Sequence, residues 1–319
     1  MLKLENVSKI YKIGTFGGKE LHAVNNVTFD IPEGKVTALI GESGSGKSTI
    51  GKMILRLISI SSGNIIFKDQ DVSRIRDRDL KKYYCKVQGV FQDPFSSLNP
   101  IFKADRIFSI IKEEYFPEIS QSEWDSRVAT SLEAVGLNPG QVLDKYPHQL
   151  SGGQVQRFLI ARALLLDIEF LVADEIISML DASTRIDVLN LLADLKTRGL
   201  AILFITHDLS LANYISERAA ILYHGCIVEM GKTEKIFTAP MHPYTKMLMA
   251  SVPRLDQKWS GEEAPIKVES KQSDFTGGCP FYERCPLASD ALGCNRFNPP
   301  ILEVENDHYA ACYQVKARE

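Results

Sequence analysis

Residues 41–49 read Gly-Glu-Ser-Gly-Ser-Gly-Lys-Ser-Thr and fit a phosphate-binding pattern of glycine, four further residues, glycine, lysine and serine. The apolar run at 36–40 predicts a buried strand before this segment, and 48–57 predicts a helix that begins where the glycines end. Glycines let backbone N–H groups turn towards a polyphosphate, while the helix N-terminus and Lys47 supply positive charge. A plain glycine-rich turn would need neither the lysine nor the serine. The segment therefore predicts binding of a nucleoside triphosphate.

The same loop would help to hold the metal ion that accompanies the nucleotide. Ser48 is placed to offer its hydroxyl to Mg²⁺ bound to the phosphates. The candidate nucleotide contacts in this segment are Gly41, Ser43, Gly44, Gly46, Lys47, Ser48 and Thr49. Lys47 is also a candidate catalytic residue, because its charge would act on the phosphates during transfer.

The composition of the chain restricts the ligands it would bind and the cell compartment in which it would work. The net charge of -3 gives no positive field that would gather nucleic acid. The N-terminus lacks the apolar stretch of a secretory signal, and no segment has about 18 uninterrupted apolar residues. We therefore expect a cytosolic protein unless a partner holds it at a membrane. In that setting the 6 cysteines favour free thiols or metal ligands over disulfides.

The order of apolar runs predicts an α/β fold. Residues 1–35 alternate apolar and polar positions, which predicts a small antiparallel sheet. Further strands are predicted at 63–67, 87–91, 170–173 and 201–205, helices at 154–166 and 183–196, and a solvated helix face at 74–82. Between 100 and 147 the pattern is helical, which predicts a helical insertion. The alternation predicts a largely parallel sheet with active groups at its strand ends.

The strand at 170–173 is followed by two acids, Asp174 and Glu175. Two acids at a strand end often do no more than begin a polar loop, but here they follow a phosphate loop. Asp174 would hold the Mg²⁺ shell, and Glu175 would orient or deprotonate a water that attacks the γ-phosphate. The pair predicts hydrolysis of the nucleotide.

The stretch Leu-Ser-Gly-Gly-Gln at 150–154 is the most specific in the chain. It places a serine cap and two glycines at a helix start, where an ordinary helix would need only the serine. This stretch is the signature of the ATP-binding cassette (ABC) ATPases, and about the first 240 residues resemble that family. The resemblance implies that ATP is sandwiched in a head-to-tail dimer. The signature residues that complete the partner's ATP site would be Ser151, Gly152, Gly153 and Gln154.

Four further positions match motifs of this family. Tyr11 matches the aromatic residue that stacks on adenine, although its strand position alone favours ordinary packing. Gln92 matches the glutamine that touches Mg²⁺ and water, and Asp181 closes a segment, 178–181, that resembles the loop crossing the dimer interface. His207 matches the histidine that contacts the γ-phosphate, where a lone histidine would be an ordinary polar residue.

The chain departs from the family pattern directly after its two acids. Members commonly have proline and threonine there, whereas this chain has Ile176 and Ile177. Because both acids are retained, we predict active hydrolysis. The change bears on how the interface loop sits, and so on the rate more than on the activity itself.

Two longer stretches resemble the ATPase subunits of dipeptide and oligopeptide importers. One is Gln-Asp-Pro-Phe-Ser-Ser-Leu-Asn-Pro at 92–100, and the other is His-Pro-Tyr-Thr at 242–245, followed by Leu248 and Pro253. The second stretch opens the C-terminal extension that is typical of that branch. The resemblance to the branch therefore spans nearly the whole chain.

The tail carries four cysteines within 34 residues, namely Cys279, Cys285, Cys294 and Cys312. Four thiolates can bind a [4Fe-4S] cluster or a tetrahedral Zn²⁺, and the spacing is neither that of a zinc knuckle nor that of a bacterial ferredoxin. The residues alone thus leave a cluster, zinc, and free or disulfide-linked thiols open. Some members of the peptide-importer branch carry an iron–sulfur cluster on a similar tail, including the Cys-Pro and Arg-Cys-Pro pattern at 279–280 and 284–286. The resemblance implies a [4Fe-4S] cluster that holds the tail folded.

The predicted domain organisation follows from these motifs. An ABC ATPase domain is expected over 1–240, with its helical subdomain at about 93–150. A peptide-importer-type extension with the four cysteines is expected over 241–319, with a loose polar connector at 256–275. The remaining cysteines, Cys85 and Cys226, are expected to be ordinary buried residues.

The resemblance implies an ATP-hydrolysing subunit that powers uptake of dipeptides or oligopeptides through ATP-driven dimerisation. Its partners would be a second ABC ATPase, either a related chain or a second copy, and two integral-membrane permeases at the cytoplasmic face of the membrane. An external solute-binding protein would act indirectly, and nucleic acid is not expected. An importer of oligosaccharides such as β-glucosides or of nickel, a soluble non-transport ABC ATPase, and an ATP-binding module with a redox-sensitive tail are the alternatives.

Overall fold

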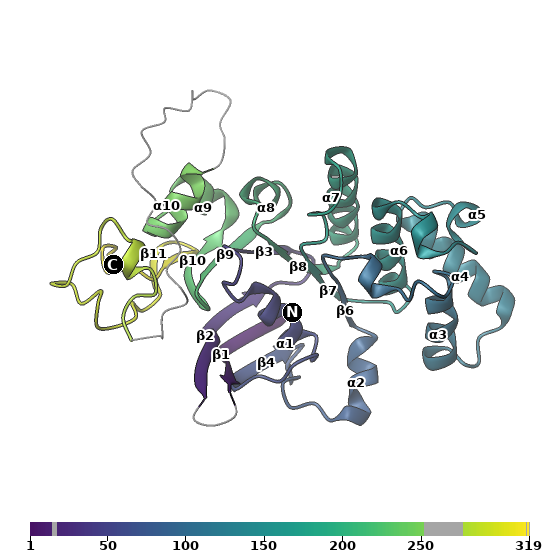
Figure 1. Cartoon of the computed structure of the whole chain (residues 1–319), viewed down its shortest axis with the longest axis horizontal. Helices are drawn as coiled ribbons and strands as arrows, with labels where there is room; N and C mark the ends of the chain where they lie inside the picture. Colours follow the sequence, from purple (N-terminus) through teal and green to yellow (C-terminus); the bar gives the residue numbers. More distant parts are fainter. Residues whose placement is uncertain (15–17, 252–276, 317, 319) are drawn as a thin grey trace. The chain divides into compact units, whose positions relative to one another are not determined.

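A computed structural model describes residues 1–14, 18–251, 277–316 and 318 (Figure 1). The chain divides into two compact units. The first unit comprises 1–32, 36–74 and 204–319, and the second comprises 33–35 and 75–203. The predicted connector at 256–275, and Pro253 of the importer motif, lie outside the described residues.

The N-terminal sheet of the first unit is antiparallel, as predicted. Its strands are β1 (Leu2–Ile13), β2 (Lys19–Ile31), β4 (Ser62–Phe67) and β5 (Gln70–Asp71), in the order β2-β1-β4-β5. The pairs β1/β2, β1/β4 and β4/β5 all run antiparallel. Leu2 and Leu4 are buried on either side of the exposed Lys3 at the start of β1, and Val27, Phe29 and Ile31 are buried at alternate positions of β2, which explains the period of two in these parts of the sequence. The predicted strand at 63–67 is therefore part of this sheet.

The second set of strands in the first unit contains the strand that leads into the phosphate loop. Its order is β11 (Leu302–Glu305), β12 (His308–Ala310), β10 (Cys226–Lys232), β9 (Arg218–Tyr223) and β3 (Val36–Ile40). The pair β3/β9 is parallel, whereas β9, β10, β12 and β11 pair antiparallel in turn. The strand at 36–40 is confirmed residue for residue, whereas the antiparallel strands beside it were not predicted from the sequence.

The helices of the first unit are short. They are α1 (Lys47–Ile54), α8 (Leu209–Ile215), α9 (Thr233–Thr238) and α10 (Pro243–Ala250), with a 3₁₀ turn η3 at Tyr282–Arg284. Helix α1 begins one residue before its predicted start and ends three residues before its predicted end. Asp208 caps α8 by accepting hydrogen bonds from the N–H groups of Ser210 and Leu211.

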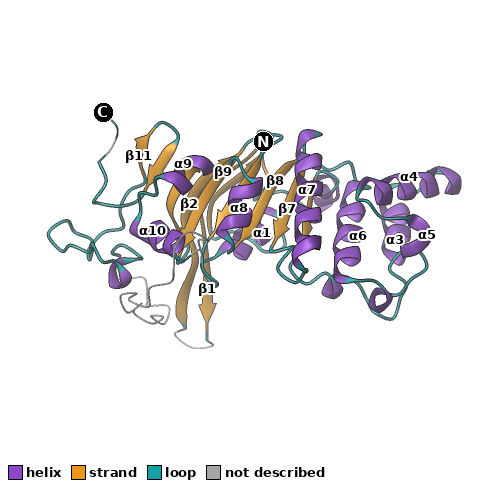
Figure 2. Cartoon of the chain, turned by 90° about the horizontal axis from the view of Figure 1, so that it is seen from above, coloured by secondary structure: helices purple, strands orange, loops and turns teal. Residues whose placement is uncertain are grey.

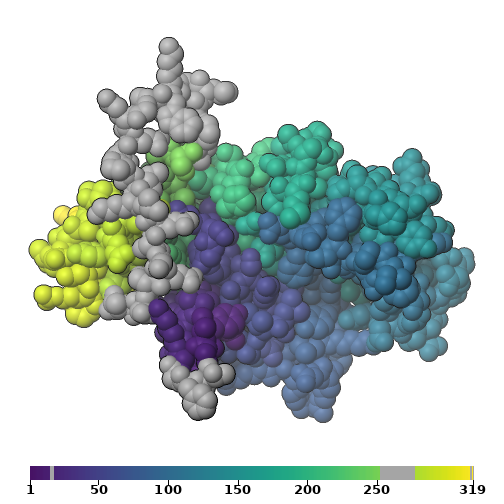
Figure 3. Space-filling model, viewed as in Figure 1, coloured from purple at the N-terminus to yellow at the C-terminus, as the bar shows by residue number. Residues whose placement is uncertain are grey.

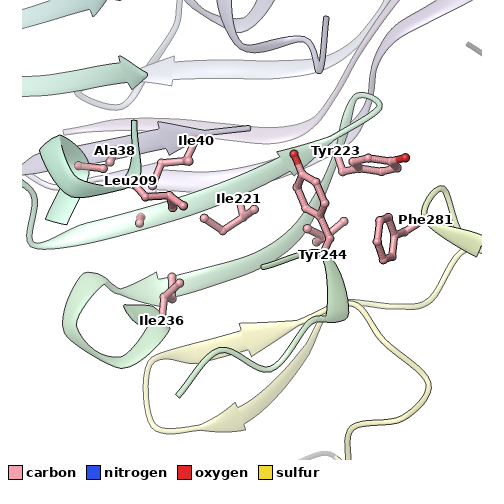
Figure 4. Packing of buried hydrophobic residues seen from close by; sticks show 11 residues of the cluster. Ala38, Ile40, Leu209, Ile221, Tyr223, Ile236, Tyr244 and Phe281 are labelled. Atoms are coloured by element: carbon pink, nitrogen blue, oxygen red, sulfur yellow. The ribbon is translucent and has the colours of Figure 1, made fainter. Parts of the chain in front are cut away.

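A buried apolar cluster joins the C-terminal tail to the strands of this unit (Figure 4). The rings of Tyr223, Tyr244 and Phe281 gather on one side of it, at centroid separations of 4.6, 5.2 and 5.5 Å. All three side chains are at most 1% exposed. Burial of three aromatic rings is a large stabilising term, so the tail, which is yellow in Figure 3, is packed into the fold rather than tethered to it.

A buried polar group makes a second attachment for the tail. Glu229 of β10 and His308 of β12 are both fully buried, with Nε2 of the histidine 2.7 Å from Oε1 of the glutamate. The two carboxylate oxygens of Glu229 also accept hydrogen bonds from the backbone N–H groups of Met241 and His242, each at 2.8 Å. Because these bonds satisfy the buried carboxylate, they fix β12 and the start of α10 against β10.

The second unit combines three strand segments with a helical group. Its strands are β8 (Ala201–Thr206, of which 201–203 belong to this unit), β7 (Phe170–Asp174) and β6 (Val87–Val90), in that order. Strands β6 and β7 pair in parallel, as the α/β pattern predicts. Both lie at their predicted positions to within one residue.

The helices of the second unit follow the predicted pattern. They are α2 (Asp77–Tyr84), α3 (Arg106–Tyr115), α4 (Gln121–Ala134), α5 (Pro139–Val142), α6 (Gly152–Leu164) and α7 (Ala182–Thr197), with 3₁₀ turns η1 (Phe95–Ser97) and η2 (Pro147–Gln149). Helices α3 to α6 form a group with no strand among them (Figure 2), so the predicted helical insertion is confirmed for this part of the chain. Among the described residues, no helix is both long and apolar enough to span a bilayer.

Replacement of the buried tail aromatic, Phe281→Ala, should lower the free energy of unfolding by about 3 kcal/mol, because the ring is 1% exposed and would leave a cavity. The matched control is Phe297→Ala in the same tail, where the side chain is 65% exposed and the loss should stay below about 0.5 kcal/mol. Urea unfolding followed by tryptophan fluorescence and circular dichroism measures both. Equal losses in the two variants would contradict this packing.

Candidate nucleotide-binding site

The phosphate loop lies between β3 and α1 and is shaped by glycine. A Cβ on Gly41 would stand 2.2 Å from the carbonyl oxygen of Leu222 in β9. Gly46 has φ 104°, and a Cβ there would stand 2.4 Å from the carbonyl oxygen of Ala23 in β2. Neither position accepts a side chain, so the spacing of glycines reflects the close passage of backbone past backbone.

Lys47 is held inside this loop. Its side chain is 5% exposed, and its Nζ donates hydrogen bonds to the carbonyl oxygens of Gly41 and Glu42, both at 2.8 Å. The N–H of Ser45 donates to the same Glu42 oxygen at 3.2 Å. The ammonium group is thus fixed beside the loop backbone, where it can meet a phosphate oxygen.

The other candidate residues of the first unit are more open. Ser43, Gly44 and Ser48 are exposed, and Thr49 is half-buried. The ring of Tyr11 on β1 is 36% exposed, with Nζ of Lys9 5.0 Å from its centroid.

In the second unit the two acids stand at the end of β7. Asp174 is 6% exposed, and Glu175 is half-buried with φ 50°, an uncommon left-handed conformation for a residue with a side chain. Oγ of Ser178 donates to the carbonyl oxygen of Glu175 at 2.9 Å and helps to hold this turn. The departure at Ile176 and Ile177 is buried, at 1% and 2% exposure, so these residues serve as core packing.

Gln92 and His207 stand just past strand ends. Gln92 lies two residues after the end of β6 in the second unit, and His207 follows β8 at the start of the last segment of the first unit. Both side chains are exposed. Each therefore has the accessibility that contact with a bound nucleotide requires.

The start of α6 is a complete capping box. Oγ of Ser151 accepts from the N–H of Gln154 at 3.2 Å, and Oε1 of Gln154 accepts from the N–H of Ser151 at 2.8 Å. The predicted cap is thereby confirmed as local structure. These two hydrogen bonds prevent the first turn of α6 from fraying, so the helix N-terminus keeps its partial positive charge in a fixed direction.

The start of α7 lies against the start of α6. Asp181 caps α7, and its carboxylate accepts from Ser183 Oγ at 2.7 Å, Thr184 N at 3.0 Å and Thr184 Oγ1 at 2.8 Å. These hydrogen bonds, the one from Ser183 first, hold the pKa of Asp181 well below its usual range. A Cβ on Gly153 would stand 2.4 Å from Cγ2 of Thr184, so the glycine is required by this approach.

All four tail cysteines line one small pocket. The pocket is also lined by His242, Tyr282, Leu287 and Tyr313, among others. Burial raises the pKa of Cys279 to about 11 and raises those of Cys285 and Cys312. Among the described residues, no group of three or more histidine, cysteine, aspartate or glutamate side chains is arranged so that it could hold a metal ion. In a [4Fe-4S] cluster each of the four thiolates binds a different iron, so its cysteines stand farther apart than the ligands of one ion.

The remaining cysteines differ from one another. Cys226 is buried, as expected, and accepts from Nδ2 of Asn25 at 3.8 Å. Cys85 is only half-buried, so the expectation of an ordinary buried residue is wrong for it.

Two residues beside the loop, Tyr244 and Arg284, have no role that the sequence predicts. Oη of Tyr244 accepts from the backbone N–H of Glu42 at 3.0 Å, and the guanidinium of Arg284 makes two hydrogen bonds to the Glu42 carboxylate. Both residues lie within the stretches that resemble the peptide-importer branch. Their position in these stretches could have drawn attention to both residues. The spacing of the stretches along the chain, however, does not reveal that they contact Glu42.

The fit between Gly153 and Thr184 gives a test of the helix junction. Gly153→Ala should lower the free energy of unfolding by about 1–3 kcal/mol, because the new methyl group overlaps Thr184. Gly153→Ala with Thr184→Ser should recover most of this loss, since the clashing methyl is removed and the hydroxyl to Asp181 is kept. The matched control is Gly152→Ala, whose Cβ would meet Leu180 at an ordinary 3.6 Å. Thermal unfolding measures all three, and a stable single Gly153→Ala variant would contradict the fit.

Comparison with known families and proteins agrees with this geometry. Residues 24–178 match the family model described as ABC transporter, and residues 228–294 match the one described as Oligopeptide/dipeptide transporter, C-terminal region. A putative peptide import ATP-binding protein of Brucella ovis is 39% identical over 98% of this chain and 97% of its own. The oligopeptide transport ATP-binding protein AppF of Bacillus subtilis is 38% identical, with the same two coverages.

Solved structures show the same fold. A dimeric structure of the ATP-binding cassette MJ0796 in a post-hydrolysis state with ADP and Pi matches with a TM-score of 0.66 and 31% identity, over 73% of this chain and 99% of that one. The structure of cbiO1 from Clostridium perfringens matches with a TM-score of 0.64 and 26% identity, over 75% and 90%. This chain therefore belongs to the ATP-binding cassette ATPases of the ABC transporter family.

Proposed function

We propose that this chain is the ATP-hydrolysing subunit of an importer for dipeptides or oligopeptides. The observation that carries the ATPase part is the phosphate loop, in which the buried Lys47 is held by two loop carbonyls and followed by the exposed Ser48. The importer part is supported by the match of residues 228–294 to a transporter C-terminal region and by relatives of nearly equal length that are named for peptide import.

In this proposal the first unit binds the nucleotide. Lys47 and the backbone N–H groups of the loop contact the phosphates, and Ser48 binds Mg²⁺ through its hydroxyl. The exposed ring of Tyr11 stacks on the adenine. Gly41, Ser43, Gly44, Gly46 and Thr49 complete the phosphate contacts. His207 contacts the γ-phosphate.

The second unit supplies the groups for hydrolysis. Asp174 and Gln92 hold the Mg²⁺ shell, and Glu175 orients or deprotonates the attacking water. The buried position of Asp174 suits a carboxylate that serves a metal ion, and the constrained backbone of Glu175 suits a side chain whose direction must be fixed.

The signature residues and Asp181 serve the partner subunit. Ser151, Gly152, Gly153 and Gln154 present the capped start of α6 to the γ-phosphate bound by a second ABC ATPase, either a related chain or a second copy. Because Asp181 is tied to Thr184 and Thr184 lies against Gly153, the interface loop and the signature would move together. Two composite ATP sites follow from such a pairing.

The tail cysteines are proposed to bind a [4Fe-4S] cluster. Cys279, Cys285, Cys294 and Cys312 line a single pocket, and this convergence fits a group that binds all four. Bound iron would displace the thiol protons that burial now stabilises. The role of the cluster would be to hold this small cysteine-bearing segment folded, because so short a segment buries little core of its own.

The domain organisation and location follow from the same proposal. Residues 1–240 act as the ABC ATPase domain with a helical subdomain at about 93–150, and 241–319 act as the importer-type extension. The chain would sit at the cytoplasmic face of the membrane, bound to two integral permeases that receive solute from an external binding protein. Such permeases would supply the membrane spans and the solute path.

The hydrolytic role is tested by Glu175→Gln, which removes the base and keeps the shape. ATP hydrolysis should fall by about a hundredfold or more, while ATP binding is retained. In cells with the variant as their sole copy, uptake of a labelled tripeptide should stop. The control is Glu133→Gln, an exposed acid on α4 of the same unit. Native turnover in Glu175→Gln would contradict the assignment, and continued peptide uptake without hydrolysis would contradict the importer.

The cluster is tested by metal content after purification without oxygen. Iron and acid-labile sulfide should each be about four per chain, with a broad visible absorption band, and both should be lost in Cys285→Ser. The control is Cys85→Ser, because Cys85 lies in the second unit. Zinc in place of iron, or no metal in freshly prepared protein, would contradict the cluster and leave the ATPase proposal standing.

A further inference from the structure

Glu42 of the phosphate loop is in contact with the C-terminal tail. The carboxylate of Glu42 accepts two hydrogen bonds from Arg284, from Nη1 at 2.8 Å and from Nη2 at 3.0 Å. Its backbone N–H donates to Oη of Tyr244 at 3.0 Å. The side chain of Glu42 is therefore held by η3, and its backbone is held by α10.

The Arg284 pair differs from an ordinary surface ion pair. The arginine side chain is 13% exposed and the glutamate 40%. The guanidinium carbon lies 5.7 Å from the ring centroid of Tyr223 and 5.8 Å from that of Phe281. Nη2 also lies 3.7 Å from Sδ of Met247. Two parallel hydrogen bonds and a partly desolvated, ring-lined setting fix the geometry of this pair.

Arg284 is rigidly joined to the cysteine-bearing part of the tail. Its N–H donates to the carbonyl of Phe281 at 3.1 Å, and Cys285 N–H donates to the carbonyl of Tyr282 at 3.2 Å. Cys279, at the other end of this turn, donates from its N–H to the carbonyl of Cys294 at 2.8 Å. The turn that presents Arg284 thus begins and ends at two cysteines that line the tail pocket.

On its other side, Glu42 is joined to the lysine of the phosphate loop. Its carbonyl oxygen accepts from Nζ of Lys47 at 2.8 Å and from the N–H of Ser45 at 3.2 Å. A rotation of the Glu42 peptide would move both contacts. In addition, an unpaired carboxylate at this position would repel the phosphates that the loop binds.

We infer that Arg284 and Tyr244 are positioning residues for the phosphate loop, through which the cysteine-bearing turn of the tail sets the affinity of this chain for ATP. The inference rests on the proposed ATP binding and adds a control of that binding from the tail. Neither residue is proposed to touch the nucleotide. They act by fixing Glu42, and through it Lys47.

The first test measures binding of Mg²⁺-ATP to the full-length chain by isothermal titration. Arg284→Met should raise the Kd roughly tenfold, as expected for loss of charge-assisted hydrogen bonds, and KM for ATP should rise more than kcat falls. Arg284→Lys should lie between Arg284→Met and the wild type, because it keeps the charge without the paired geometry. The control is Arg296→Met, an exposed arginine of the same tail, which should bind like the wild type.

The double variant Glu42→Gln with Arg284→Met separates positioning from charge. If the pair acts by positioning, the affinity of the double variant for ATP is no lower than that of either single variant, but it stays well below the affinity of the wild type. Recovery of wild-type affinity would overturn the positioning role, because it would reduce the effect to charge repulsion. Additive losses would also overturn it.

The link to the tail is tested with Cys285→Ser. It should weaken ATP binding in the wild-type background and have no further effect in the Arg284→Met background. Tyr244→Phe, which keeps the packed ring and removes only the acceptor for the Glu42 N–H, should weaken binding by a smaller factor and serves if Arg284→Met fails to fold. If the wild type binds ATP and Arg284→Met binds it with the same Kd, this inference is overturned. If the wild type binds no ATP, the proposed function itself is overturned.

Discussion

The close passage of backbone past backbone at the phosphate loop is the constraint on which the rest of the first unit depends. Gly41 passes the carbonyl of Leu222 in β9, and Gly46 passes that of Ala23 in β2, at separations that no side chain tolerates. The loop is therefore shaped by strands from both sheets of the unit as well as by its own sequence. Because Nζ of Lys47 donates hydrogen bonds to two loop carbonyl oxygens, the path of the loop backbone determines where this side chain lies. A stable pair of sheets is thus the condition for a formed phosphate site.

The sequence predicted the elements whose pattern is local. The run at 36–40 is apolar apart from Thr37 and is followed by a glycine, and it matches β3 residue for residue. Strands β9 and β10 were not predicted, because the turn that connects them lacks the residues that usually mark a β-hairpin. His224 and Gly225 both have positive φ, 44° and 80°, a conformation usually marked by Asn-Gly or Asp-Gly. With histidine in the first place, the hairpin did not stand out, and the antiparallel part of the sheet was lost with it.

The sequence named candidate site residues but did not predict what surrounds them. Motif spacing named Lys47, Glu175 and the signature residues, since each motif is a short run. The contact of Glu42 with Arg284 joins residues 242 positions apart, and no local pattern encodes such a distance. The same limit applied to Ile176 and Ile177, where the departure from the family pattern was visible but its burial was not. Long-range packing decided these points.

The separation of Glu42 and Arg284 along the chain has a consequence for biosynthesis. A ribosome makes the phosphate loop early and the arginine that holds it 242 residues later. Until then the Glu42 carboxylate has no guanidinium beside it, and its backbone N–H lacks the Tyr244 hydroxyl until shortly before. A nascent chain can thus form the N-terminal sheet and pair β3 with β9 while the phosphate loop is still without these two contacts. The full affinity for ATP would be reached only when translation is almost complete, so a chain still on the ribosome would bind the nucleotide more weakly than the finished protein.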